Sequence, residues 1–338
     1  MPPTGSPRLT PRWRSLGVLL VFAIVGGVTA LPQKQPLEGT LEATAISFTV
    51  PPTLQGEGAP FLGLALRSLS LQSLGEGGPL RVKMNRETLD LDQNGSLTLE
   101  ASAAKPGPGK VLYLELRLPA GAHLRQLQAD GSGERTLRLD VLPPAGKGDQ
   151  PPVALRITPD QNLRARISQP EVKALSVPAS EFSPLVTGGV QLILTPMAPG
   201  KDVAFESALP VQKLELETET QSMFNDAPPV VSSSLRGGEL HLGRREPLKL
   251  RAGQFLRIQP PGVSELTDLR LQAKGGTFSL GVVGESTGLS AGLSRKFGTT
   301  VVQGTLLSRF FSPEQIASFY GFLTGMASSV LLQLFKGD

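Results

Sequence analysis

Apolar and polar residues alternate along most of the chain between Leu37 and Phe311. At residues 112–118, leucines occupy every second position and are separated by Tyr113, Glu115 and Arg117. This period of two is typical of strands that bury one face, and no strong helical period competes with it. Strands without intervening helices favour antiparallel sheets, so we expect a mainly β protein of β-sandwich or layered-sheet domains. The same alternation recurs at residues 137–141, 153–157, 163–167, 248–250 and 269–271.

An uncharged apolar segment lies near the start of the chain. Residues 16–31, "LGVLLVFAIVGGVTAL", follow Arg8, Arg12 and Arg14. Sixteen residues fall between the apolar region of a signal peptide and the roughly 20 residues of a full membrane span. The basic residues before the segment orient its start toward the cytoplasm. We expect an apolar helix that serves as a signal anchor, with a cleaved signal peptide, cut after the small residues Val28 and Ala30, as the alternative.

A second uncharged segment, Ile316–Phe335, lies near the end of the chain. Ser312 and Gln315 form a capping-box pattern around Pro313, which predicts the start of a helix. Within the segment, Gly321, Gly325, Ser328 and Ser329 form a stripe of small residues that permits close approach between helices in lipid. We predict that this helix spans the bilayer and packs on another helix through the stripe. A helix docked on its own sheet is the alternative.

Prolines and polar residues suggest how the chain is divided. Paired prolines flank a polar, glycine-containing stretch at residues 143–152, which is typical of a linker. The loop at residues 224–234 is an alternative boundary within the second half. The predicted division is a cytoplasmic basic tail at 1–15, the apolar segment at 16–31, a β domain at 37–142, a linker at 143–152, a second β domain at 153–311 and the apolar helix at 313–335.

The stretch "LDLDQNGSLTLE", residues 89–100, fits two structures. Asp90, Asp92 and Asn94 have the spacing of a calcium loop, but the glutamate comes one position too early for an EF-hand. A hairpin with a three-residue loop ending at Gly95 instead places Leu89 and Leu91 on one face with Leu97 and Leu99. We therefore predict a β-hairpin, and a calcium site of another type is the alternative. Asn94 also begins a glycosylation sequon, which matters only in a eukaryotic host.

Catalytic patterns are weak in this chain. "GESTG" at residues 284–288 matches the nucleophile motif around Ser286, but the histidine that hydrolases require after the serine is missing. An enzyme would need His123 or His241 within hydrogen-bond reach of Ser286. With only these two histidines and no cysteine, thiolate zinc modules and histidine-rich metal clusters are excluded, and no cofactor is expected.

Charge adds one hypothesis about binding. The net charge of +4 over 338 residues is small, and no basic block is interleaved with aromatic residues, so nucleic acid is not an expected partner. A basic cluster within a short part of the chain is most simply a solvated strand face. It also predicts contact with anionic lipid headgroups or an acidic partner. Its members are Arg236, Arg244, Arg245, Lys249, Arg251 and Arg257.

Together these patterns predict a membrane-tethered, extracytoplasmic protein whose partners are membrane lipid and, through its C-terminal helix, another protein. The expected role is non-enzymatic: a structural or interaction component of an envelope or membrane complex. A lipid-handling or lipid-transport module is the alternative, and an uninterrupted apolar groove would distinguish it. No motif is specific enough to indicate a family.

Overall fold

A computed structural model gives the structure of the protein. It describes residues 20–336 with gaps. The gaps are residues 22, 28, 30, 55–57, 77–79, 85–86, 93–94, 102–111, 131–135, 145–152, 159–162, 170–171, 179–181, 186–187, 198–200, 207, 221–228 and 274.

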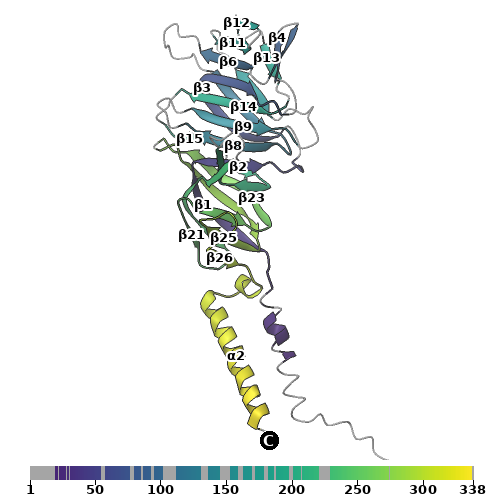
Figure 1. Cartoon of the computed structure of the whole chain (residues 1–338), viewed down its shortest axis with the longest axis vertical. Helices are drawn as coiled ribbons and strands as arrows, with labels where there is room; N and C mark the ends of the chain where they lie inside the picture. Colours follow the sequence, from purple (N-terminus) through teal and green to yellow (C-terminus); the bar gives the residue numbers. More distant parts are fainter. Residues whose placement is uncertain are drawn as a thin grey trace, which may run out of the picture.

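The larger sheet has 11 antiparallel strands and forms the part of the body farthest from the C-terminal helix (Figure 1). Its main path runs β12 (Val172–Pro178), β11 (Leu163–Gln169), β6 (Ser96–Ala101), β3 (Ala59–Ser73), β14 (Val190–Pro196), β9 (Leu137–Leu142), β8 (His123–Ala129), β2 (Ala45–Thr49) and β17 (Lys213–Glu215). The long strand β3 also pairs with β7 (Leu112–Leu118), which in turn pairs with β10 (Ala154–Thr158). Thus β3 forms a branch point of this sheet.

The second sheet has seven strands and lies between the larger sheet and the C-terminal helix (Figure 1). Its path runs β15 (Val203–Ala204), β23 (Pro261–Leu271), β24 (Phe278–Ser286), β1 (Gln35–Ala43), β20 (Leu235–Leu242) and β21 (Leu248–Arg251), with β16 (Leu209–Pro210) on β23. Smaller sheets combine β13 (Phe182–Leu185), β4 (Leu80–Met84) and β5 (Glu87–Leu91); β18 (Glu217–Thr220) and β19 (Val230–Ser233); and β22 (Phe255–Ile258), β25 (Gly288–Gly292) and β26 (Thr300–Gln303).

The alternation in the sequence correctly predicts which residues face the core. Leu112, Leu114, Leu116 and Leu118 of β7 are all fully buried, whereas Tyr113 between them is exposed. Side chains of a strand point alternately to its two faces, so a period of two places every leucine on one side. The mainly β class with antiparallel sheets is thereby confirmed.

One hydrophobic core runs through both large sheets. A row of phenylalanine rings crosses the junction: Phe48 and Phe61 come from the larger sheet, Phe205 follows β15, and Phe278 lies on β24. Successive ring centroids are 5.9, 5.1 and 6.1 Å apart. Aromatic rings at such separations contribute packing energy beyond area burial. The two sheets are therefore joined by a continuous core rather than by a linker.

The strand pairing groups the chain differently from the division predicted at residues 143–152. β10 follows that stretch but pairs with β7, which precedes it, and β14 pairs with β3 and β9. β1 starts the chain's folded body yet belongs to the second sheet, between β20 and β24. Residues 145–152 lie outside the described residues. The alternative boundary at 224–234 falls partly outside them too, and β18 and β19 on its two sides pair with each other.

The hairpin predicted at residues 89–100 is wrong in its pairing. Both strands form, and the Gly95 amide donates to the Asp92 carbonyl at 2.7 Å, so the chain does turn here. However, β5 pairs with β4, and β6 pairs with β3 and β11. The turn passes the chain from one sheet to another, and Leu91 and Leu97 are still buried. The leucine pattern fixes the buried face, but it does not specify the neighbouring strand.

The C-terminal helix α2 spans Pro313–Lys336. Its predicted capping box is present: the Ser312 amide donates to Gln315 Oε1 at 3.0 Å, and the Gln315 amide donates to Ser312 Oγ at 3.4 Å. The N-terminal helix predicted over 16–31 is not shown as an element. Residues 20, 21, 23–27 and 29 are helical, and the remainder of its first half lies outside the described residues.

Candidate functional site

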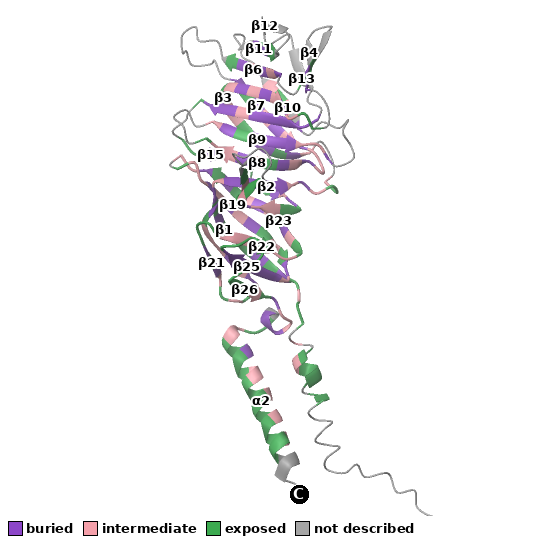
Figure 2. Cartoon of the chain, in the orientation of Figure 1, coloured by how far each residue is buried: buried purple, intermediate pink, exposed green. Residues whose placement is uncertain are grey.

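The helix α2 projects from the body instead of packing on a sheet (Figure 2). It is the one helix among the described residues that is long and apolar enough to cross a membrane, over Pro313–Leu332, and 6% of that stretch is buried. Phe322 and Leu332 are 65% and 60% exposed. The structure therefore contradicts the alternative prediction, in which this helix packs on a sheet of the same chain.

Hydroxyl groups in the helical segments bond to the backbone of the same segment. Thr324 Oγ1 donates to the Tyr320 carbonyl at 2.8 Å, and Ser329 Oγ donates to the Gly325 carbonyl at 3.0 Å. Thr29 Oγ1 donates in the same way to the Val25 carbonyl at 2.8 Å. Since these hydroxyls are satisfied without water, they add little to the cost of placing the segments in lipid.

The helical residues at 20–29 lie beside the first half of α2 (Figure 1). The hydroxyl oxygens of Thr29 and Tyr320 are 3.3 Å apart. Leu20, Val21 and Ile24 are 55–60% exposed, so this segment is as uncovered as α2. Two apolar segments from opposite ends of the sequence thus leave the same end of the body.

The predicted helix-packing residues lie on an open face of α2. Gly321, Gly325, Ser328 and Ser329 are all exposed. A Cβ atom built on Gly321 or Gly325 meets no described atom within 4 Å outside the helix's own backbone. The contact with the N-terminal segment runs through Tyr320 instead, which leaves the stripe free.

Hydrogen bonds hold the two connections to the apolar segments together. Thr305, shortly before α2, bridges to Pro32, and its carbonyl accepts from Gln35 Nε2 at 3.0 Å. Two of the predicted basic residues, in the turn after β20, add hydrogen bonds at this place. Arg245 Nη2 donates to Thr305 Oγ1 at 3.4 Å, and Arg244 Nη1 donates to the Phe310 carbonyl at 3.2 Å. Both apolar segments are therefore fixed to the second sheet at one place.

The other basic residues do not gather there. Arg236, Lys249 and Arg251 are exposed on β20 and β21, and Lys249 lies opposite Glu239 in the register. Arg257 lies on β22 and lines a separate pocket. The structure thus divides the predicted cluster into a pair beside the connection to α2, a strand face and a pocket residue.

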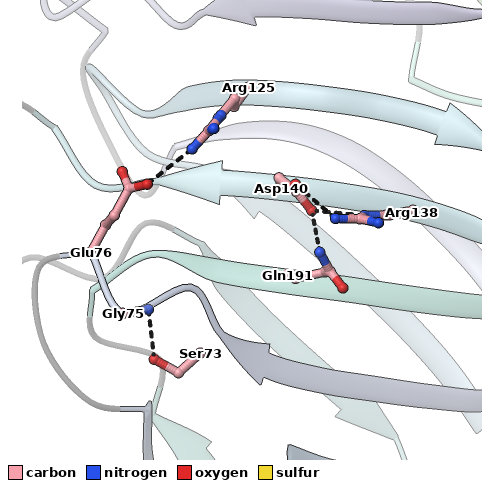
Figure 3. A network of polar contacts seen from close by, with 7 residues as sticks. All are labelled: Ser73, Gly75, Glu76, Arg125, Arg138, Asp140 and Gln191. Atoms are coloured by element: carbon pink, nitrogen blue, oxygen red, sulfur yellow. Dashed lines mark hydrogen bonds and ion pairs between the residues drawn. The ribbon is translucent and has the colours of Figure 1, made fainter. Parts of the chain in front are cut away.

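Figure 3 shows a polar network on the larger sheet. The Asp140 side chain is 8% exposed, and its carboxylate accepts from Gln191 Nε2 at 2.8 Å and from Arg138 Nε at 3.3 Å. Gln191 and Asp140 are register partners on β14 and β9. Nearby, Arg125 Nη1 and Glu76 Oε1 form an ion pair at 2.9 Å. A buried carboxylate with these partners stabilises the register of the two strands, because a shifted strand would leave it unpaired.

The three residues of the predicted catalytic alternative each contact other groups. Ser286 is fully buried, and its hydroxyl lies 2.8 Å from the Gln259 carbonyl and 2.7 Å from the Gly288 carbonyl. His123 Nδ1 instead lies 3.0 Å from Thr49 Oγ1, and His241 Nε2 lies 3.3 Å from Glu239 Oε1.

The predicted calcium alternative lies partly outside the described residues, because Asn94 is not among them. Asp90 forms an ion pair with Arg81 at 3.2 Å, which uses one of the two carboxylates. Within the described ranges, no group of three or more potential metal ligands comes together.

A pocket of about 680 Å³ lies where the two large sheets meet β22 and β25. Its lining is partly apolar, including Leu214, Leu256 and Ile258, and partly charged. Burial raises the pKa of the Glu217 carboxyl above its ordinary value, although the neighbouring Arg295 opposes that shift. The charged lining residues are Lys213, Glu215, Glu217, Arg257, Arg295 and Lys296.

The sequence analysis missed this pocket. It is built from separate segments, chiefly residues 212–217, 255–263 and 290–298. Arg257 is the one member that the sequence pattern singled out, and it did so for its charge. Alternation predicts a strand's buried face but gives no sign of which distant strands will border a hollow.

Comparison with known proteins identifies no relative: no protein-family model, no curated protein and no solved structure matches the chain.

Proposed function

We propose that the protein is a membrane-tethered, extracytoplasmic component of an envelope or membrane complex, with a structural or interaction role rather than a catalytic one. The observation that carries this proposal is the uncovered helix α2. Its residues Ile316–Phe335 carry no charge, and it stands away from a body that already has its own core.

The exposed side chains of α2 explain why a membrane is the favoured surrounding. Phe322 and Leu332 are mostly exposed, and Met326 is 39% exposed. Each large apolar side chain gains about 1.5–3 kcal/mol when it is removed from water. A run of such residues is therefore strongly favoured to enter lipid or to pack on another apolar helix.

The arrangement of charges supports an extracytoplasmic body. Arg8, Arg12 and Arg14 precede the N-terminal apolar segment, and cytoplasmic flanks of membrane segments are enriched in Lys and Arg. If both apolar segments span, both chain ends are cytoplasmic and the body is outside, with Lys336 on the cytoplasmic side. The free stripe of Gly321 and Gly325 then offers a surface for a partner helix in the membrane.

Lipid handling is the weaker proposal. It would be favoured by an uninterrupted apolar groove, whereas the pocket between the sheets has carboxylates and cations among its lining residues.

The larger sheet holds its distal strands β11 and β12 far from α2 (Figure 1), which suits a component that presents a surface at a distance from the membrane.

Cysteine labelling of the full chain tests the location, because the natural chain has no cysteine. Lys201→Cys on the body should react with a membrane-impermeant maleimide in intact right-side-out membranes. Ser328→Cys in α2 should react only after detergent is added. Rapid labelling of Ser328→Cys without detergent contradicts the membrane span, and protection of Lys201→Cys contradicts the external body.

Deletion tests the anchor independently. Removing residues 313–338 together with residues 1–31 should release the protein from membranes, whereas either deletion alone should leave it bound. A full-length chain that fractionates as a soluble monomer without detergent would rule out the tether.

A further inference from the structure

The pocket between the sheets is bordered by the edges of two strands. β17 is an edge strand of the larger sheet, and β22 is an edge strand of the three-stranded sheet β22-β25-β26. Within the described chain, β17 pairs only with β2, and β22 pairs only with β25. Every residue of both strands lines the pocket. A strand that presents one face contributes alternate residues, so an unbroken run indicates that the strand edges border the hollow.

The register of β22 shows which of its backbone groups point into the pocket. The Gln259 amide donates to the Gly288 carbonyl at 2.9 Å, in line with the pairing of Arg257 with Ser290 and of Phe255 with Gly292. Bonded and non-bonded pairs alternate in antiparallel strands, so the N–H and C=O groups of Leu256 and Ile258 point away from β25. No described backbone group pairs with them across that edge.

The charges in the pocket favour an acidic ligand. Lys213 pairs with Glu215 at 2.6 Å, and Arg295 pairs with Glu217 at 3.2 Å. Arg257 Nη2 donates to the Arg295 carbonyl at 3.4 Å, which uses one of its five donor hydrogens. Neither Arg257 nor Lys296 forms an ion pair with a carboxylate in the described part of the chain. The charges of Arg257 and Lys296 are therefore not neutralised by a described carboxylate and can attract an acidic ligand.

Apolar surface lies beside these charges. Leu214, Leu256 and Ile258 are half-buried and pack against the core below the pocket. The loop after β25 carries Leu293 and Phe297, which are 77% and 75% exposed. A ligand for this site would therefore combine acidic groups with apolar ones.

We propose that the pocket binds an extended peptide segment of a partner protein, with alternating apolar and acidic side chains, which adds to β22 as a further strand. This inference rests on the proposed interaction role and names the partner's chemistry. Backbone pairing with Leu256 and Ile258 supplies affinity, as in other strand-addition complexes. Alternate side chains of the added strand then face the apolar floor and the cations Arg257 and Lys296.

A single-chain amphipathic anion such as a fatty acid could use the same cations and apolar floor. It would leave the backbone groups of Leu256 and Ile258 unpaired. The free strand edge therefore favours the peptide, and backbone dependence of binding separates the two ligands.

The test uses the full chain in lipid nanodiscs and a fluorescent peptide probe, acetyl-Val-Glu-Val-Asp-Val-Glu-amide, followed by anisotropy. A second probe has the same side chains but every backbone amide methylated, so that neither edge of the strand can donate, and a third has lysine in place of each acid. Loss of the backbone hydrogen bonds to Leu256 and Ile258 should weaken binding of the methylated probe at least tenfold. The lysine probe should not bind.

Protein variants locate the site. Arg257→Glu and Lys296→Glu should each weaken binding of the first probe by about fivefold to tenfold, since a charge pair is replaced by a repulsion. Arg251→Glu, an exposed change on β21 outside the pocket, is the matched control and should stay within twofold. Equal binding of the methylated probe, or full displacement of the peptide by dodecanoate with no backbone dependence, overturns the inference in favour of an acyl anion.

Failure of all three probes to bind also overturns the inference. It leaves the proposed membrane location standing, because cysteine labelling measures that location separately.

Discussion

The hydroxyl oxygens of Thr29 and Tyr320 lie 3.3 Å apart although the two residues are 291 positions apart in the chain. The two segments are held together close to this contact, where Thr305 forms a β-bridge with Pro32 and its carbonyl accepts a hydrogen bond from Gln35. The chain therefore enters and leaves the β body at the same place, and the two apolar segments extend from there side by side.

This pairing can be measured by crosslinking. A Thr29→Cys and Tyr320→Cys double variant should be joined within one chain by a short bismaleimide, because both side chains face each other beside the body. Gel mobility and mass spectrometry report the product. Each single variant is the control, and a product that appears only between chains would show that the contact is intermolecular.

Replacement of Phe205 should destabilise the whole body. Its ring lies 5.1 Å from Phe61 and 6.1 Å from Phe278 and so links the two large sheets. Phe205→Ala should cost about 3–5 kcal/mol, and because the core is continuous, both sheets should unfold in one transition. Phe297→Ala, at a site that is 75% exposed, should change the stability by less than about 0.5 kcal/mol. Thermal unfolding followed by circular dichroism compares the two, and two separated transitions would contradict the shared core.

Two neighbouring glycines of β20 should respond differently to alanine. Gly238 has φ of 145°, and a Cβ there would lie 2.5 Å from the Thr40 carbonyl oxygen of β1. At Gly237 the nearest atom to a new Cβ is 3.9 Å away. Gly238→Ala should cost at least about 1–3 kcal/mol because backbone strain adds to the clash, whereas Gly237→Ala should be nearly neutral. Equal midpoints of unfolding for the two variants would show that β1 and β20 are not packed as described.

Stability should fall on acidification through His123. Burial lowers the pKa of this imidazole below its ordinary 6.5, and Glu215 only partly opposes the shift. As the pH falls below 6.5, the unfolded chain gains a proton before the folded chain does, so unfolding is favoured until the pH passes the folded pKa. His123→Asn should reduce the difference between the thermal midpoints at pH 7.5 and pH 5.5. An unchanged difference would assign the pH dependence to other groups.

Local patterns in the sequence predicted the parts of the fold that depend on neighbouring residues. The alternating leucines of β7 gave a strand and its buried face, since side-chain direction follows from the strand's own geometry. The capping box at Ser312 and Gln315 located the start of α2 for the same reason, because the groups that it satisfies lie within one turn.

The tertiary structure alone decided which strands pair and which surfaces remain open. β5 and β6 are adjacent in the chain, and their leucines fit a hairpin, yet they lie in different sheets. Burying a leucine is favourable against any apolar neighbour, so the pattern specifies a face without naming the strand beside it. For the same reason the pocket at β22 was not predicted: it depends on where distant strand edges end, and that follows from packing of the whole chain.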